Sequence, residues 1–329
     1  MTALAPTLQS YFTERLIGQR RASPNTIAGY RDTVRLLLGF AAEKTGKRPC
    51  DLDVADVDAP LVASFLEHLE SDRSNAVATR NNRLAAVHSL FGWAALRHPE
   101  HAASIQRVLA IPPKRVERNL VTFLNEEEVD ALVGACRRDT WTGRRDHAMI
   151  VLFIQTGLRI SELASLACAD VTLGTGAHVS CIGKGRKLRQ TPLVPVTIGV
   201  LKTWLAERGG SPPDPLFPTS KGRPLSRDAI ERRLSLYVTR AVTTCPSIGS
   251  KHVTAHTLRH TCAMSLLRSG VPIEVIALWL GHEQVATANI YLHADMSMKE
   301  RAIERVRPPN TTPGRYRPSD PLLAFLEAL

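Results

Sequence analysis

The sequence predicts a mainly α-helical protein of two domains, with one small β-hairpin or sheet in the second domain. Three observations lead to this prediction. Helical periodicity runs through residues 1–110, a proline-rich basic break follows at 111–119, and β-branched residues gather around one glycine-rich turn near residue 184. The 329 residues suffice for two hydrophobic cores, since 44% of them are hydrophobic.

Residues 1–110 have the pattern of successive helices. One begins at Ser23, which is followed by proline, a common start signal. Another carries Leu84 and Phe91 on its apolar face, while Arg80 and Arg83 crowd its beginning. We therefore expect a helical domain with a polar, basic rim.

The second domain is expected to begin after an exposed linker at residues 111–119. Asn125 and Glu128 have the spacing of a capping box, which predicts a helix start. Ser226 predicts another start, and Gly281 predicts the end of a helix that opens after Pro272. Helices should therefore dominate this domain outside the hairpin.

The composition favours a polyanionic partner. The chain has 42 Lys plus Arg against 31 Asp plus Glu, a formal charge of +11, which suits nucleic acid better than an anionic membrane surface. No segment has the roughly 20 apolar residues of a membrane span, and no signal peptide opens the sequence, so we expect a cytoplasmic, nucleoid-associated protein. The six cysteines include no C-x-x-C pair, and we interpret them as reduced and mostly buried.

The segment "AHTLRH" at residues 255–260 concentrates positive and titratable groups. In a helix, His256, Arg259 and His260 share one face. The zinc pattern H-E-x-x-H fails here, because Thr257 stands where its Glu should be and Arg259 would lie beside the metal. A phosphate suits an arginine fork and imidazole donors better, although a satisfied surface or core trio is the ordinary alternative.

Other segments strengthen the phosphate interpretation. Arg159 follows a Thr-Gly turn at a helix start, where it opposes the macrodipole, although it could simply pair with Glu162. Lys184 lies at the hairpin tip, His282 follows a helix end, and Tyr291 comes nine residues later. Each has an ordinary alternative, as a solvated charge or a core aromatic, but the combination suits one common cleft.

These residues resemble the ordered signature of the tyrosine recombinase or phage integrase family, especially Xer-type recombinases and transposon-borne integrases. The signature has an Arg in a T-G-L-R helix start, a Lys in a β-hairpin, an H-x-x-R helix, L-G-H, and a Tyr about nine residues later. The matching residues are Arg159, Lys184, His256, Arg259, His282 and Tyr291. The resemblance covers roughly residues 5 to 305 and is weaker over the N-terminal helices.

The resemblance implies a DNA clamp made of a helical, SAM-like core-binding domain at 1–110, a linker at 111–119 and an α+β catalytic domain at 120–306. It implies cleavage and rejoining of duplex DNA through a 3′-phosphotyrosine on Tyr291, without metal, ATP or other cofactor. Arg159, Arg259 and His282 would bind the phosphate, His256 would be the base and Lys184 the acid. Glu162 would orient the site, and His260 would support it without contacting the phosphate.

The resemblance also implies partners, and the sequence leaves two other functions open. We expect double-stranded DNA as partner, contacted by Arg80, Arg83, Lys114 and Arg115, and a homotetramer in the synapse, or a hetero-tetramer with a related recombinase. The tail at 307–329 departs from the Xer pattern, and its apolar end would dock on a neighbouring protomer or in cis. The alternatives are a catalytically silent accessory or architectural DNA-binding protein, and a topoisomerase-like enzyme that assembles no synapse.

Overall fold

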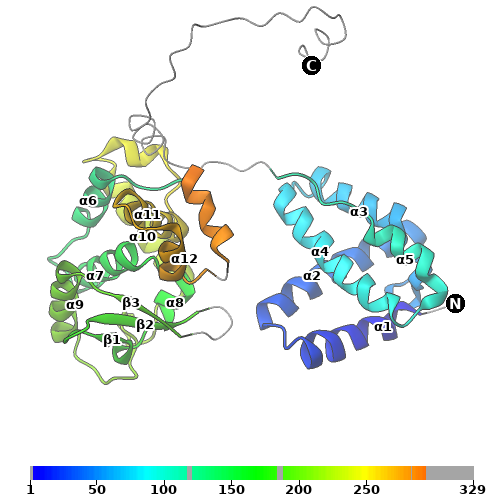
Figure 1. The fold of residues 1–329 in the computed structure, drawn as a ribbon, viewed down its shortest axis with the longest axis horizontal. Coiled ribbons are helices and arrows are strands. Elements are labelled where there is room, and N and C mark those ends of the chain that lie inside the picture. Colours follow the sequence, from blue (N-terminus) through cyan, green and yellow to red (C-terminus); the bar gives the residue numbers. More distant parts are fainter. Residues whose placement is uncertain (1–2, 117–120, 184–187, 283, 294–329) are drawn as a thin grey trace, which may run out of the picture. The chain divides into compact units, whose positions relative to one another are not determined.

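The computed structural model describes residues 3–116, 121–183, 188–282 and 284–293 (Figure 1). The chain divides into two compact units, residues 1–118 and 119–329. Each unit has its own hydrophobic core of buried aliphatic and aromatic side chains. Both units are mainly helical, as predicted.

The N-terminal unit is a bundle of helices. Its α-helices are α1 (Leu4–Ser10), α2 (Pro24–Thr45), α3 (Ala59–Ser71), α4 (Val77–Ala95) and α5 (Ala102–Leu109), with a π-helical segment at Tyr11–Gln19. The hydroxyl of Ser23 accepts a hydrogen bond from the Thr26 amide and caps α2, as its sequence signal predicts. Leu84 and Phe91 of α4 are buried in the core.

The first part of the predicted linker lies against α4. Arg80 is only 6% exposed, and its guanidinium donates to the carbonyl of Pro112 at 3.2 Å. The side chain of Asn81 donates to the Lys114 carbonyl and accepts from the Lys114 amide, at 2.8 and 3.0 Å. Arg80 therefore does not belong to an exposed basic rim, because it lies four residues before Leu84 and so on the core side of the helix.

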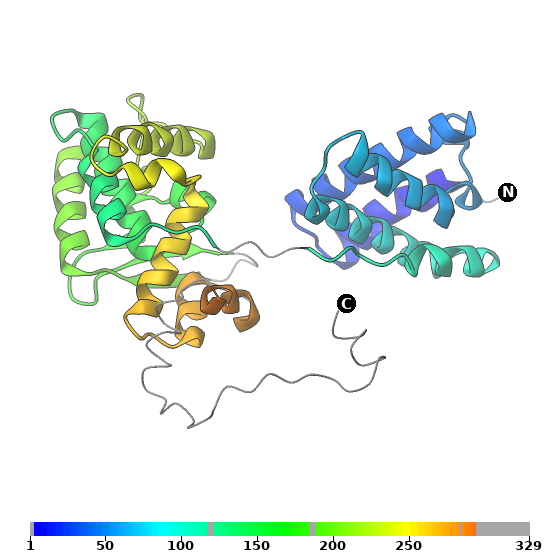
Figure 2. The ribbon, with the colours of Figure 1, turned by 90° about the horizontal axis from the view of Figure 1, so that it is seen from above.

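In the second unit, helices pack against a small sheet that lies at one edge of the unit (Figures 1 and 2). Its α-helices are α6 (Glu126–Gly134), α7 (Trp141–Thr156), α8 (Ile160–Ser165), α9 (Pro195–Arg208), α10 (Arg227–Ala241), α11 (Ala255–Arg268) and α12 (Ile273–Leu280). Asn125 and Glu128 form the predicted capping box of α6, Ser226 caps α10, and Gly281 ends α12 in the left-handed conformation at φ 66°.

The sheet contains the predicted hairpin and one further strand. Strands β1 (Val171–Thr172), β2 (His178–Ile182) and β3 (Leu188–Pro192) pair antiparallel in the order β1-β2-β3. The hairpin register pairs Ile182 with Leu188. Lys184, predicted at the hairpin tip, is outside the described residues. The structure thus describes the paired part of the hairpin, and β3 contributes one residue to the candidate site.

Within the described ranges, no helix combines the length and apolar character that crossing a membrane requires. The cysteines are unpaired; Cys136, Cys181 and Cys262 are buried, whereas Cys50 is exposed.

Candidate active site

Helix α11 carries the central motif of the site. Its first turn is capped by the hydroxyl of Thr254, which accepts from the Thr257 amide at 3.3 Å. His256 is exposed, Arg259 is buried and His260 is half-buried. The rings of His256 and His260 meet edge to face at 4.4 Å, as expected for side chains four residues apart on one helix face.

Arg259 joins three segments of the unit. Its side chain is 3% exposed and donates to the Gly157 carbonyl at 2.5 Å and to the Leu280 carbonyl at 2.6 Å. Burial and the neighbouring Arg159 lower the pKa of Arg259 to about 10, so it remains a cation at neutral pH. Arg259 therefore holds the end of α7 and the end of α12 close to each other.

Arg159 lies at the start of α8, beside Glu162. Its Nη1 donates to Glu162 Oε1 at 2.8 Å, and its amide donates to Glu162 Oε2 at 2.7 Å. The second terminal nitrogen of Arg159 donates to the Gly281 carbonyl at 3.0 Å. The side chain is 32% exposed, so Arg159 is both paired and accessible. The ordinary pairing and the predicted phosphate contact are therefore compatible.

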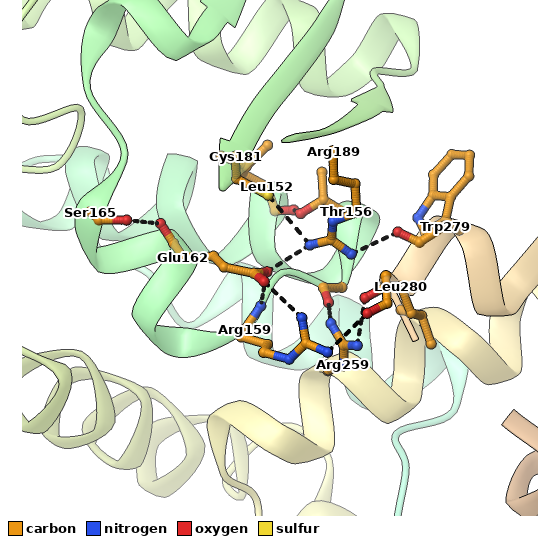
Figure 3. A network of polar contacts seen from close by, with 12 residues as sticks. Leu152, Thr156, Arg159, Glu162, Ser165, Cys181, Arg189, Arg259, Trp279 and Leu280 are labelled. Carbon is orange, nitrogen blue, oxygen red and sulfur yellow. Dashed lines mark hydrogen bonds and ion pairs between the residues drawn. The ribbon is translucent and has the colours of Figure 1, made fainter. Parts of the chain in front are cut away.

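Arg189 of β3 completes the charged network, and the sequence reasoning missed it (Figure 3). Its Nη2 donates to Glu162 Oε2 at 2.6 Å, and its Nη1 donates to the Trp279 carbonyl at 2.7 Å. The only local signal is its register: Arg189 and Thr191 lie on the same face of the strand, and Thr191 is buried. A charged residue at an inward position of a strand indicates a buried partner.

Tyr291 and His282 lie beside α11. Tyr291 belongs to a 3₁₀ segment, Val285–His293, and is 1% exposed. Its hydroxyl is 3.0 Å from His260 Nδ1, and its ring stacks on that of His282 at 6.5 Å and 11°. Burial raises the pKa of Tyr291 to about 12. The contact to His260 differs from the predicted arrangement, in which His256 serves the tyrosine.

Both of these histidines are neutral at pH 7. Burial, His256 and Arg259 lower the pKa of His260 to about 4. Burial and the nearby arginines likewise lower the pKa of His282 to about 4. A neutral His260 can accept a hydrogen bond from the tyrosine hydroxyl. His282 Nδ1 is buried and has no hydrogen-bond partner among the described residues.

The arrangement suits a phosphate group. Three guanidinium groups and one carboxylate leave an excess of positive charge next to a tyrosine hydroxyl and three imidazoles. No group of three or more His, Cys, Asp or Glu side chains is placed to hold a metal ion in the part of the chain that the structure describes. Fixed arginine forks can bind phosphate oxygens in place of a metal.

The structure thus brings together five of the predicted catalytic residues and both supporting ones. Lys184 falls outside the described residues. The four predicted DNA contacts belong to the N-terminal unit and its linker: Arg115 is exposed, Arg83 is half-buried, Arg80 is buried, and Lys114 pairs with Glu70 at 2.5 Å. Arg80 is thus used within its own unit, and the DNA contacts remain predictions.

Comparison with known proteins identifies the family. Residues 122–298 match the phage integrase family, and residues 10–98 match the N-terminal SAM-like domain of phage integrases. The chain is 50% identical over 327 residues to the "Putative integrase/recombinase y4rC" of Sinorhizobium fredii, covering 99% of this chain and 98% of the relative. It is 30% identical over 298 residues to the tyrosine recombinase XerC of Xanthomonas campestris pv. campestris, covering 90% and 87%.

Solved structures show the same fold. The Tn1549 transposon integrase, in complex with transposon right end DNA, has a TM-score of 0.70 at 16% identity and covers 93% of this chain and 99% of its own. The XerH site-specific recombinase, bound to a palindromic difH substrate, has a TM-score of 0.66 at 23% identity and covers 87% and 81%. With both family models matched and a relative of 50% identity along nearly its whole length, this chain belongs to the phage integrase family of tyrosine recombinases.

Proposed function

We propose that this recombinase cuts one strand of duplex DNA by attack of Tyr291 on the scissile phosphorus and later rejoins it to another end. The P–O bond to the 5′-oxygen breaks as the bond to the tyrosine oxygen forms, which leaves a 3′-phosphotyrosine and a free 5′-hydroxyl. The single observation that carries this proposal is the position of the Tyr291 hydroxyl. It lies 3.0 Å from His260, in the same site as the buried Arg259.

The phosphate would be held by Arg159, Arg259 and His282. Arg159 is accessible and keeps N–H groups beyond those given to Glu162 and Gly281. His282, whose ring stacks on that of Tyr291, would supply a third donor. Negative charge that develops on the equatorial oxygens would meet donors that are already fixed in place.

The proton of Tyr291 would pass to His260. Sequence reasoning favours His256 as the base, but the hydroxyl contacts His260, and the exposed His256 lies beside it. We therefore propose His260 as the direct acceptor and His256 as the neighbour that connects it to solvent or DNA. Lys184, as acid for the departing 5′-oxygen, rests on the sequence alone.

A nicked suicide duplex tests the proposal. The full chain is first incubated with fragmented genomic DNA of its source, and the DNA that stays attached after denaturation is sequenced. A duplex of the recovered sequence, nicked near the cut so that religation fails, should then accumulate a covalent adduct. Tyr291→Phe should abolish the adduct, whereas Tyr237→Phe, which changes an equally buried tyrosine bonded to Asp146, should retain it.

The accessory and topoisomerase-like alternatives predict different results. A catalytically silent DNA-binding protein would shift the duplex without any adduct. A relaxing enzyme would form the adduct but would not pair two sites. The presence of a buried tyrosine among cationic groups favours cleavage over silent binding, since binding alone needs neither Tyr291 nor His260.

Assembly is the remaining part of the proposal. We place the protein on double-stranded DNA at the nucleoid, as a tetramer in the synapse, with residues 307–329 docking on a neighbouring protomer; these residues lie outside the described ranges. Deleting them should weaken tetrameric complexes in native gels and leave single-site binding intact. Unchanged tetramer formation would rule out this role of the tail.

A further inference from the structure

Arg189 is a largely buried cation whose two terminal nitrogens are both used within the protein. It is 9% exposed, and its two terminal nitrogens contact Glu162 and the Trp279 carbonyl at 2.6 and 2.7 Å. Its aliphatic part lies against Gly281, where an added Cβ would stand 3.1 Å from Arg189 Cδ. A buried charge without a ligand role needs another explanation, since its desolvation is costly.

The three arginines of the site all donate to the end of one helix. The carbonyls of Trp279, Leu280 and Gly281, at the C-terminus of α12, accept from Arg189, Arg259 and Arg159 respectively. Helix C-terminal carbonyls lack partners within the helix and carry partial negative charge, so cations stabilise them. Figure 3 shows the arginines that donate to the Trp279 and Leu280 carbonyls. His282 follows this helix end immediately, and its amide donates to the Ala277 carbonyl, so we infer that the cap sets its position.

Arg189 also controls the carboxylate that holds Arg159. Both arginines donate to Glu162, which is 4% exposed, and Glu162 Oε2 is shared between Arg189 and the Arg159 amide. Without Arg189, the carboxylate loses one of its two cationic partners and can rotate toward the other. The position of the Arg159 guanidinium would then change, because Glu162 holds both arginines.

We propose that Arg189 is a positioning residue for DNA cleavage: it fixes the phosphate-binding Arg159 through Glu162 and the end of α12 through the Trp279 carbonyl. This inference rests on the proposed function of the site. The planar fork presents two nitrogens at a fixed separation, one to the Glu162 carboxylate and one to the Trp279 carbonyl, whereas lysine would have to reach both groups from a single nitrogen atom. Charge alone is therefore insufficient at this position.

The test compares Arg189→Lys and Arg189→Met with a matched buried arginine. Arg145 is 4% exposed and also bridges a carboxylate, Asp146, and a carbonyl, that of Pro218. Arg145→Lys should thus remove a similar guanidinium bridge that is not part of the candidate site. All variants are used as full chains whose melting temperatures are recorded, with the nicked duplex recovered in the adduct experiment as probe.

Single-turnover cleavage at saturating protein should fall about 100-fold in both Arg189 variants, because an error of about 1 Å in a catalytic group costs that much. Affinity for the duplex should stay within about threefold, and Arg145→Lys should keep near-normal cleavage. A second probe carries a methylphosphonate at the scissile position, which removes the charge that the arginines neutralise. On this probe the Arg189 defect should shrink to below about tenfold.

Each outcome decides the matter. Cleavage within threefold of the wild type on the charged duplex would overturn the proposal. Equal defects on the charged and methylphosphonate duplexes would also overturn it, because a merely structural loss would not depend on phosphate charge. If the wild type forms no adduct on any recovered DNA, the proposed function itself fails, which is a separate result.

Discussion

Replacing Glu162 with Gln should destabilise the second unit and slow cleavage together. The carboxylate is 4% exposed and accepts three hydrogen bonds, from the Arg159 amide, from Arg159 Nη1 and from Arg189 Nη2. If the glutamine oxygen takes the place of Oε2, its NH₂ group faces the Nη1 donor of Arg159. The hydrogen bond from Arg159 Nη1 is then lost, because two N–H donors face each other. Arg159 and Arg189 also lose the negative charge that they share.

The magnitude follows from this geometry. Removing one partner of a buried ion pair costs about 3–5 kcal/mol, and the 32% exposure of Arg159 places the change near the lower end. A loss of about 3 kcal/mol corresponds to a fall of about 6–12 °C in the melting temperature of a unit of this size. The cleavage rate should fall by about 100-fold as Arg159 shifts.

The assay combines thermal unfolding with single-turnover cleavage, and Glu128→Gln is the control. Glu128 is also buried, and it accepts from Lys251 and from the Asn125 amide. Its replacement should lower the melting temperature similarly while leaving the cleavage rate of the folded enzyme near normal. Two results would refute the reasoning. One is a melting temperature of Glu162→Gln within 2 °C of the wild type. The other is a cleavage rate of Glu162→Gln equal to that of Glu128→Gln.

Three further predictions follow from single contacts. Gly157→Ala should destabilise by about 1–3 kcal/mol more than Gly270→Ala in thermal unfolding, because both have positive φ but only at Gly157 would a Cβ meet Leu280 Cδ2, at 2.6 Å. The free energy of unfolding should fall as the pH drops from about 6.5 toward 4. The pKa of His260 and of His282 is about 4 in the folded state and near 6.5 in the unfolded state, so the unfolded state binds more protons in this range. Melting curves at several pH values in which His260→Gln leaves this pH dependence unchanged would contradict the prediction. Asn81→Ala should speed tryptic cleavage at the linker about tenfold, because Lys114 loses both hydrogen bonds to Asn81. A gel time course measures the rate, with a change at the exposed neighbour, Asn82→Ala, as control.

Local chemistry explains which elements could be predicted. The starts at Ser23, Asn125 and Ser226 depend on a side chain that caps an amide three residues later, and the stop at Gly281 depends on a backbone conformation that glycine favours. Both kinds of signal are contained within a few residues. The sequence alone therefore suffices for them.

The missed features depend on distant contacts. Arg189 is 27 residues from Glu162 and 90 from Trp279, so no local pattern joins them. The contact between Tyr291 and His260 spans 31 residues and depends on how the 3₁₀ segment packs against α11. The spacing of a motif predicts that its residues share a site, but not which side chain contacts which.

The charge of the network explains how the site can be assembled before DNA arrives. Three guanidinium groups would repel one another, yet Glu162 separates Arg159 from Arg189, and the carbonyls at the end of α12 accept from all three. One carboxylate against three cations leaves a net charge of +2, whereas a phosphodiester carries a single negative charge that grows in the transition state. The net charge of +2 therefore matches the larger negative charge of the transition state and not the single charge of the bound phosphodiester. Stabilising the transition state more than the ground state is the condition for accelerating cleavage. Because the helix end and Glu162 fix the donors, little reorganisation is required when the phosphate binds.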